Sequence, residues 1–370
     1  MSAHGVHGSR LFRVTPSLER SQASRWPLTR PALKRNLPVM TSISSIGPRP
    51  IKRRPFRAVG LATTALLVTA CAPAEPDETP TAEPVEAATP LIPASATLER
   101  VGELLMDPTA DGIHPDPRME EMIRLGFQIH QDPQTYASEF VGNDLTCGNC
   151  HLNAGQRDQA LPLIGAAATF PQYRRRDDRL VSLEDRIGGC FKRSMNGTPP
   201  PYDHPVMLAL DAYLNWLSNG FAMGDRPAWL GQNELAVDER IPIEELDVHR
   251  GEDLYNLQCA PCHGLDGQGI DLILAKPGPL WGPMSWNDGA GAARIWKLAG
   301  YIKYAMPLTA PGTLTDEEAQ LISAYVNSHE RPAYPDKESD FPDGIRPADA
   351  VYDTLVFPTH PLRRGDSGTR

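Results

Sequence analysis

Residues 147–151 read Cys-Gly-Asn-Cys-His, and residues 259–263 read Cys-Ala-Pro-Cys-His. C-x-x-C-H is the attachment signature of a c-type haem, in which two thiols add to the haem vinyl groups and the histidine becomes an iron ligand. Two C-x-x-C pairs could also bind zinc, but zinc does not require a histidine directly after each pair. We therefore predict two covalently bound haem c groups, with His151 and His263 as proximal iron ligands. The attachment residues are Cys147, Cys150, His151, Cys259, Cys262 and His263.

The chain repeats one plan around these two motifs. In each half a helix is expected before the motif, a loop-rich segment after it and an amphipathic helix at the end, because apolar residues recur there at helical spacing. Thr315 and Glu318 predict a capping box before the last helix. Residues 221–247 are rich in turn residues and are interpreted as a connector. The expected helices cover residues 118–131, 206–218, 248–258 and 319–329.

The predicted fold class is mainly α, because no stretch alternates for long in the manner of a strand. We expect two fused cytochrome c-type domains with long loops, the first over residues 98–232 and the second over residues 233–332. The Pro- and Asp-rich C-terminal extension, residues 333–370, is expected either to wrap round these domains or to extend away from them.

The N-terminus has the composition of a targeting segment. Residues 52–57 are basic and residues 58–70 are apolar, which is the order found in a signal peptide. The apolar run ends in Val-Thr-Ala-Cys and resembles a bacterial lipobox, so residues 1–71 are predicted to direct export with Cys71 as the lipidated residue. A plain signal peptide cleaved shortly after Cys71 is the alternative.

Two further features of the N-terminal part complete this prediction. Met40 is an alternative start of the chain, since the residues before it do not resemble the front of a signal peptide. Residues 72–97 are rich in Pro, Ala, Glu and Thr and are expected to form a disordered linker. The protein is therefore expected in the periplasm, with the membrane contacted only through a lipid on Cys71.

The distribution of charge limits the class of partner. The formal net charge is −10, but residues 1–70 contain 12 Lys/Arg against one Asp/Glu, so the remaining chain carries a charge of −21. A surface this acidic argues against nucleic acid as a partner and against broad binding to anionic membranes. An anionic small molecule would need a local basic pocket.

One cysteine is left over once the two motifs and Cys71 have been assigned. Cys190 lies in the stretch LEDRIGGCFKRSMNG, residues 183–197. If Ser182 caps a helix here with Asp185 at its third position, the spacing i, i+4, i+8 places three side chains along one helical face. Those side chains are Arg186, Cys190 and Ser194.

Cys190 and Met195 are the soft-ligand candidates for the iron held by the first motif. A lone cysteine is often no more than a small buried apolar residue. The basic surroundings of Cys190 favour a thiolate, which is both an iron ligand and a sulfur nucleophile. We therefore predict Cys190 as the distal ligand of the first haem.

Met306 is the predicted distal ligand of the second haem. It precedes Pro307 and lies 43 residues after His263, where a small cytochrome c presents a thioether ahead of its closing helix. Met284 in a Gly-Pro-Met turn is the competing candidate, and an ordinary packing role is open for either methionine.

Basic residues are concentrated before and around Cys190. Residues 173–193 contain seven Lys/Arg against four Asp/Glu. Such a run is often only a solvated face, but guanidinium groups can also hold a small oxyanion through paired hydrogen bonds. The pattern suggests an anionic sulfur compound that is oxidised at an iron–thiolate centre.

The chain resembles the dihaem c-type thiosulfate dehydrogenases, which form tetrathionate and are related to the haem subunit of the periplasmic sulfur-oxidation complex. The resemblance covers roughly residues 98–332, and the stretch that contains Cys190 is its most specific part. One position departs from the pattern, because some members have a lysine directly before the distal methionine and this chain has Ala305. The residues that carry the resemblance are 147–155, 183–197, 280–291 and 299–308.

The resemblance implies a function and roles for individual residues. It implies reversible coupling of two thiosulfate ions to tetrathionate, with two electrons leaving through the second haem to an external acceptor such as another c-type cytochrome. It implies Cys190 as distal ligand and sulfur-adduct site, with Arg176, Arg186 and Ser194 binding the anion around it. It also implies Met306 as distal ligand of the second haem.

Two other functions remain open at the level of sequence. A non-enzymatic dihaem electron-transfer protein of sulfur metabolism would use Cys190 only to tune a potential. A peroxidase would need an open iron position with an acid–base group, and the sequence indicates none.

Overall fold

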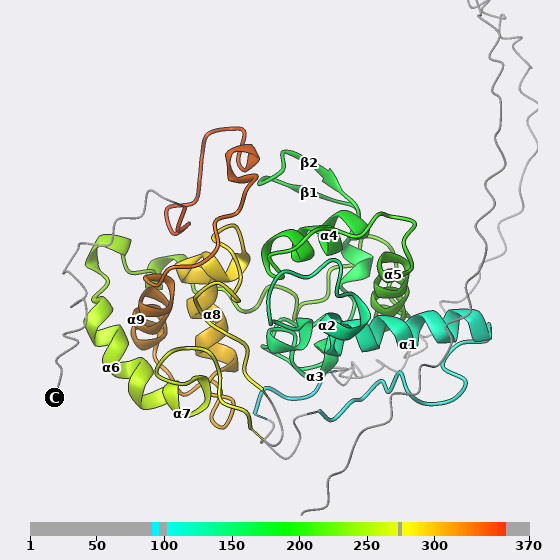
Figure 1. The fold of residues 1–370 in the computed structure, drawn as a ribbon, viewed down its shortest axis with the longest axis horizontal. Coiled ribbons are helices and arrows are strands. Elements are labelled where there is room, and N and C mark those ends of the chain that lie inside the picture. Colours follow the sequence, from blue (N-terminus) through cyan, green and yellow to red (C-terminus); the bar gives the residue numbers. More distant parts are fainter. Residues whose placement is uncertain (1–90, 96–101, 273–275, 353–370) are drawn as a thin grey trace, which may run out of the picture. The chain divides into compact units, whose positions relative to one another are not determined.

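The computed structural model describes residues 91–95, 102–272 and 276–352, which all belong to one compact unit spanning residues 81–370 (Figure 1). The predicted targeting segment with Cys71 lies outside the described residues, and so does nearly all of the predicted linker. The described part is mainly helical with a single two-stranded hairpin, which confirms the expected fold class. None of its helices combines the length and the hydropathy needed to span a bilayer.

The first half is built on two long helices and the helix of Cys190. Helix α1 (Pro117–Gln131) begins at Asp116, whose side chain accepts a hydrogen bond from the Arg118 N–H, with Pro117 in the first turn. Short helices follow, and α4 and α5 close the half; α1 and α5 pack against each other. The other elements are α2 (Pro133–Tyr136), η2 (Cys147–Asn149), α3 (Leu152–Gly155), η3 (Ala167–Thr169), α4 (Leu183–Arg193) and α5 (Pro205–Leu217).

A small hairpin precedes α4. Strands β1 (Gln172–Arg174) and β2 (Arg179–Val181) pair antiparallel, with Gln172 opposite Val181 and Arg174 opposite Arg179. The hairpin was not expected from the sequence, because three residues a strand are too few to show an alternating pattern.

The second half contains α6 (Val248–Gln258), α7 (Ala260–His263), α8 (Ile295–Ala305) and α9 (Asp316–Asn327). The capping box predicted for the last helix is present: Thr315 Oγ1 accepts from the Glu318 N–H, and Glu318 accepts from the Thr315 N–H. Helix α8 was not predicted. The segment before Met306 had been interpreted as part of a loop, whereas its apolar residues form a buried helical face. Three-residue 3₁₀ turns occur at Val237–Glu239, Ile243–Glu245, Gly291–Ala293 and Lys337–Ser339.

Each half brings its first and last helices together at a glycine. A Cβ on Gly126 of α1 would overlap the carbonyl oxygen of Ala209 in α5, and a Cβ on Gly251 of α6 would overlap the carbonyl oxygen of Leu321 in α9. The absence of a side chain therefore allows the backbones to approach closely. The two halves share this packing device at corresponding positions.

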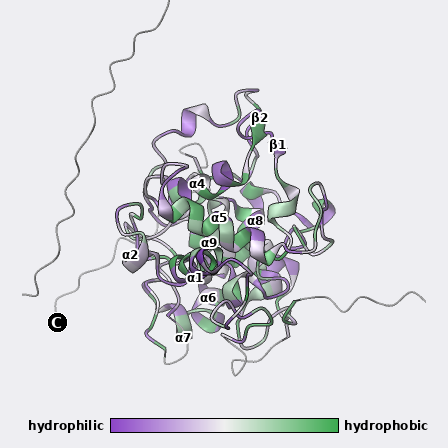
Figure 2. Cartoon of the chain, turned by 90° about the vertical axis from the view of Figure 1, so that its right-hand side faces the viewer, coloured by the Kyte–Doolittle hydropathy of each residue, from purple (hydrophilic) through white to green (hydrophobic). Residues whose placement is uncertain are grey.

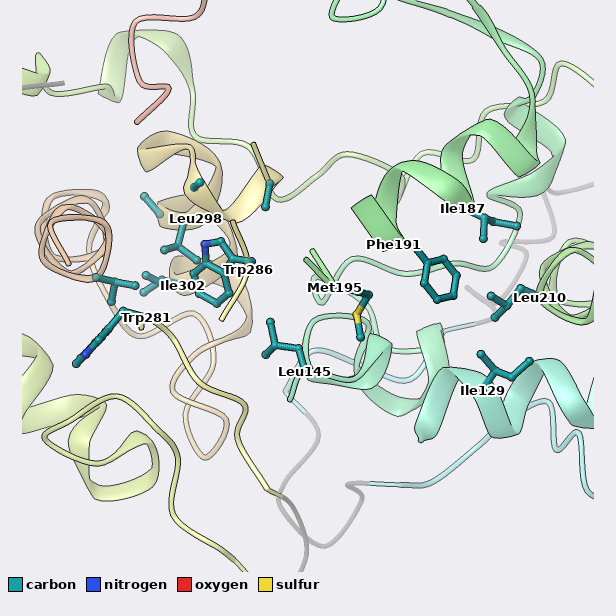
Figure 3. Packing of buried hydrophobic residues seen from close by; sticks show 14 of the residues in the cluster. Ile129, Leu145, Ile187, Phe191, Met195, Leu210, Trp281, Trp286, Leu298 and Ile302 are labelled. Carbon is teal, nitrogen blue, oxygen red and sulfur yellow. The ribbon is translucent and has the colours of Figure 1, made fainter. Parts of the chain in front are cut away.

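One hydrophobic core runs through both halves. Hydrophobic residues gather on the central helices, α5 and α8 among them, with hydrophilic residues towards the outside (Figure 2). The core cluster includes Leu145 and Met195 from the first half and Trp286 and Leu298 from the second (Figure 3). The predicted domain boundary at residues 232 and 233 stays a prediction, and this continuous core lies across it.

The C-terminal extension folds back as far as it is described. We call residues 334–352 the C-terminal strap. It leaves the end of α9 and passes along the β1–β2 hairpin of the first half (Figure 1), where the Phe341 N–H donates to the Arg176 carbonyl at 2.9 Å. Of the two expectations, the wrapped one describes the strap; residues 353–370 lie outside the described part.

Candidate functional site

The first C-x-x-C-H motif presents a histidine whose tautomer is set by the backbone. His151 Nδ1 lies 2.6 Å from the carbonyl oxygen of Leu161. Nδ1 must therefore carry the proton, which leaves the Nε2 lone pair available to a metal. Burial, the largest cause, lowers the pKa of His151 to about 4, and the positive charge of Arg186 acts in the same direction. A neutral imidazole is the form that an iron requires.

Three thiols converge near this histidine. Cys147, Cys150 and Cys190 are all unpaired. Burial raises the pKa of Cys147 to about 12 and that of Cys150 to about 11, and the charge of Cys190 contributes to both shifts. The electrostatic influence of Cys190 on both attachment cysteines indicates that its thiol lies close enough for its charge to act on theirs. These donors fit a haem c with two thioether attachments and a sulfur available near its face.

Helix α4 carries Cys190 in its last turns. It begins as predicted with a capping box, in which Ser182 Oγ accepts from the Asp185 N–H at 3.2 Å and Asp185 accepts from the Ser182 N–H at 3.1 Å. Arg186 Nη1, one turn before the cysteine, donates a hydrogen bond to Cys190 Sγ at 2.9 Å. The helical face predicted from the spacing is therefore formed for Arg186 and Cys190.

Ser194 and Met195 follow Cys190 at the end of the helix. Ser194 is the C-cap of α4, and its N–H donates to the carbonyl of Cys190. Met195 is 4% exposed and packs in the hydrophobic core beside Leu145 (Figure 3). The apolar packing of Met195 leaves Cys190 as the better placed sulfur of the two candidates.

The arginines near Cys190 divide into two groups. Arg174 is electrostatically linked to Arg186 and Cys190: burial is the largest cause that lowers its pKa, Arg186 is the next, and the charge of Cys190 opposes the shift. Sequence reasoning did not single out Arg174, although it belongs to the run of basic residues that precedes α4.

Arg176 lies in a second group with Arg193. Arg176 Nη1 donates to the Gly289 carbonyl at 2.8 Å, and its Nε lies 3.9 Å from Asp340 Oδ2. Arg193 donates to both carboxylate oxygens of Asp340, at 2.7 and 2.6 Å. The structure therefore brings Arg176 to the C-terminal strap, while Arg186 is the predicted anion-binding residue that directly contacts Cys190.

The end of α4 is capped by residues from outside the helix. Asn287 Nδ2 of the second half donates to the Lys192 carbonyl at 2.8 Å, and the Asn287 N–H donates to the Arg193 carbonyl at 3.2 Å. Asn143 Nδ2 donates to the Ser194 carbonyl at 2.8 Å. These bonds satisfy the carbonyls that a helix leaves free at its end, so both halves fix the helix of Cys190.

The second half also touches the first motif itself. Tyr301 of α8 donates to the Asn149 carbonyl at 3.4 Å, and Asn149 Nδ2 donates to the Lys276 carbonyl at 3.1 Å. Burial raises the pKa of Tyr301 well above its usual value, and the charge of Cys150 adds to the effect. Helix α8 therefore connects the first attachment site with the segment that ends at Met306.

The second C-x-x-C-H motif forms a second pocket. Cys259 and Cys262 are unpaired thiols, and burial raises the pKa of Cys259 to about 12 with Cys262 as the next cause. Burial also lowers the pKa of His263 to about 4. His263 Nδ1 is buried and has no hydrogen-bond partner among the described residues. Two thiols beside a neutral histidine again suit a covalently attached haem.

Met306, the predicted thioether ligand, lies at the end of α8. It is the half-buried C-cap of α8, and its N–H donates to the Ile302 carbonyl at 3.0 Å. Its competitor Met284 is 38% exposed, and its carbonyl accepts from the Asp144 N–H of the first half. The backbone contact gives Met284 a role in joining the halves, and Met306 remains the predicted ligand.

Two segments of the chain match known cytochrome families. Residues 134–223 match the SoxA/TsdA cytochrome c domain. Residues 246–326 match subunit III of the cbb3-type cytochrome c oxidase. The first segment contains residues 147–151 and Cys190, and the second contains residues 259–263. The matches confirm two cytochrome c domains and two covalently bound haem c groups, and the zinc alternative is dropped.

Complete proteins resemble the chain over longer stretches. A thiosulfate dehydrogenase of Stutzerimonas stutzeri (strain A1501) is 41% identical over 240 residues, which cover 63% of this chain and 75% of the relative. A thiosulfate dehydrogenase of Allochromatium vinosum is 38% identical over 268 residues, which cover 70% of this chain and 97% of the relative. A solved structure of thiosulfate dehydrogenase (TsdBA) from Marichromatium purpuratum, in its as-isolated form, aligns with a TM-score of 0.56 at 37% identity, covering 62% of this chain and 50% of that chain.

Proposed function

The chain belongs to the thiosulfate dehydrogenase family, and from that premise we propose that it couples two thiosulfate ions to tetrathionate in the pocket of Cys190. Membership of the family makes the protein an oxidoreductase that acts on thiosulfate and carries two haem c groups. The product, the residues that bind the substrate and the iron ligands are the content of the proposal.

The proposed reaction joins two dianions and releases two electrons. Each thiosulfate loses one electron from its outer sulfur, and one S–S bond forms between the two sulfurs; no proton or oxygen atom is transferred. The two haems, when bound, take up these electrons and pass them on. The chain itself must overcome the repulsion between two dianions, so it must place positive charge where they meet.

Arg186 and Arg174 supply that positive charge beside Cys190. The Arg186–Cys190 hydrogen bond of 2.9 Å is the observation that carries the proposal, because a guanidinium fixed against a thiol can hold an oxyanion beside the same sulfur. Arg174 is partly buried and electrostatically linked to both residues. Ser194, one turn beyond Cys190, is proposed to donate its hydroxyl to the anion.

The proposed iron ligands follow the two pockets. His151 and Cys190 would hold the first iron, and His263 and Met306 the second. An anionic thiolate lowers the potential of an iron, whereas a Met/His pair raises it. Electrons would therefore leave the pocket of Cys190 for the second haem.

A cytochrome electron carrier is the expected partner, and we propose that it is a separate c-type cytochrome. The proposed location is the periplasm, with Cys71 carrying a lipid. The proposed location follows from the sequence of residues 1–71. The proposed carrier follows from the electrons, which would leave through the second haem and need an external acceptor. Membrane fractionation of cells that express Cys71→Ala tests the anchor, since the variant should be released into the soluble fraction.

Replacing Cys190 tests the function directly. Cys190→Ser should retain both haems, because its attachment motifs are intact, but should form tetrathionate from thiosulfate at less than about one hundredth of the wild-type rate with ferricyanide as acceptor. Haem content is measured from the pyridine haemochrome spectrum. Arg175→Gln is the control, since Arg175 is an exposed arginine of the same hairpin that pairs with Asp343.

Two results would contradict the proposal. Full tetrathionate formation by Cys190→Ser would remove the cysteine from the reaction. Wild-type protein that exchanges electrons with other cytochromes but consumes no thiosulfate would favour the electron-transfer alternative.

A further inference from the structure

The C-terminal strap is anchored to the second half at both of its ends. At its start the Tyr334 N–H donates to Asp288 Oδ1 at 2.6 Å. At its end the buried Asp349 accepts from Arg294 Nε at 2.8 Å and from the Trp296 N–H at 3.1 Å. The middle of the strap therefore lies between two segments that are anchored to the second half.

The middle of the strap lies against the basic segment of the first half. Asp336 and Lys192 approach to 3.5 Å, and Asp343 and Arg175 to 3.0 Å, with side chains that are largely exposed. Asp340 differs from both of these acids, because it is only 3% exposed. It receives the two hydrogen bonds of Arg193 already described, and the Tyr352 hydroxyl also donates to it.

Arg193 is held in one orientation by this contact. Besides Asp340, its Nη1 donates to the Gly289 carbonyl at 3.2 Å, and its guanidinium carbon lies 4.0 Å from the centre of the Tyr334 ring. A carboxylate that binds both arms of a guanidinium fixes its plane as well as its position. Arg193 also forms part of the wall of a cavity of about 440 Å³ beside α4, which the strap helps to enclose through Tyr334.

Arg193 connects Asp340 with the pocket of Cys190. It lies three residues after Cys190 on α4, about 60° away around the helix axis. The charge of Arg193 lowers the pKa of both Arg174 and Arg176. The pKa of Arg174 is also affected by the charges of Arg186 and Cys190. Buried guanidinium groups repel one another, and burial together with Arg193 brings the pKa of Arg176 to about 10. Asp340 is the buried carboxylate that lets Arg176 and Arg193 lie side by side.

We propose that Asp340 is a positioning residue of the anion site: the strap carries it from the far end of the chain to orient Arg193 beside the helix of Cys190. The inference rests on the proposed function, because the anion to be bound is thiosulfate. The two segments that match cytochrome families end at residue 326. The inference therefore gives a role in the anion site to a residue that lies beyond them.

The test measures thiosulfate binding and turnover separately in the holoprotein. Asp340→Asn keeps the shape of the side chain but removes the charge that orients Arg193. We expect its thiosulfate Kd, from titration calorimetry on the fully reduced protein, which cannot oxidise the ligand, and its KM to rise at least about five-fold, with kcat within about two-fold. Asp343→Asn is the matched control on the same strap, and its Kd should be unchanged because its ion pair with Arg175 is exposed.

A double-mutant cycle that combines changes at Asp340 and Arg193 shows whether Asp340 acts through that arginine. The pair Asp340→Asn, Arg193→Gln leaves no unpaired charge between the two positions, so it remains testable if the single change impairs folding. Its Kd should equal that of Arg193→Gln alone, since Asp340 has then lost the group that it orients. A Kd for the pair well above that of Arg193→Gln would overturn the inference.

Two further outcomes would overturn the proposed role of Asp340, and a third would instead bear on the proposed function. A Kd that falls in Asp340→Asn would mean that the carboxylate only offsets positive charge. An unchanged Kd and KM would remove it from the anion site. Wild-type protein that neither binds nor oxidises thiosulfate would instead contradict the proposed function.

Discussion

At the scale of single residues, the hydrogen bond between Arg186 and Cys190 is the contact on which the proposed site rests. Both were predicted from the sequence, because a helix places residues i and i+4 on one face and the capping box made that helix probable from local residues alone. Arg176 and Arg193 could not be placed in this way. Their position depends on Asp340, which is more than 140 residues away along the chain, and no local pattern predicts such a pairing.

The geometry of Arg186 predicts a cost for replacing it with lysine. Arg186→Lys keeps the charge but replaces a planar group with a flexible point charge. A hydrogen bond to a charged group is worth about 1.5–3 kcal/mol, so kcat/KM for thiosulfate should fall about 10- to 100-fold. Steady-state kinetics measure this change. Arg175→Lys is the control, and an equal loss in both variants would show that only the total charge of the hairpin matters.

At the scale of helices, an element could be predicted from the sequence where the residues that determine it are close together in the chain. The capping boxes at Ser182 and Thr315 were predicted because four consecutive residues, from the N-cap to the third helical position, contain all the information. Helix α8 was missed because a conspicuous Met-Pro at its end suggested a loop, and the hairpin was missed because its strands are short. The close approaches at Gly126 and Gly251 depend on which helices meet, which the sequence of one helix does not contain.

Those two glycines predict matched losses of stability. A methyl group at Gly126 or Gly251 would press on a backbone carbonyl of the partner helix, which cannot move unless the helices separate. Gly126→Ala and Gly251→Ala should each lower the free energy of unfolding by about 1–3 kcal/mol. Gly291→Ala, with nothing within 4 Å of the added carbon, should change it by less than about 0.5 kcal/mol. Thermal unfolding of the holoprotein is the measurement; equal effects at all three positions would refute the packing argument.

At the scale of the whole molecule, both halves hold the helix of Cys190 in place. The sequence predicted two similar units in a row, and family matches confirm two cytochrome c domains. It did not predict that the second half caps the helix of Cys190 through Asn287 or that the strap returns to the first half. Contacts between distant segments are set by the packed structure, and a repeat along the chain gives no information about them.

Asn287 predicts how strongly the halves depend on each other. Its side chain is fully buried, donates to the Lys192 carbonyl and accepts from the Gly289 N–H. Asn287→Ala leaves these groups without partners, so the free energy of unfolding should fall by about 1–3 kcal/mol. Asn215→Ala, which removes an exposed amide, is the control in the same denaturant titrations. Loss of stability in the control alone would contradict the capping role.

The strap also determines when the site is finished. Ribosomes make a chain from its N-terminus, so both haem-attachment motifs and Cys190 are synthesised before Asp340. A chain cut short after the second motif contains both haem-attachment motifs, yet it lacks the carboxylate that orients Arg193. Under the proposed role of Asp340, full affinity for thiosulfate therefore depends on a residue that is made after both haem-attachment motifs and Cys190.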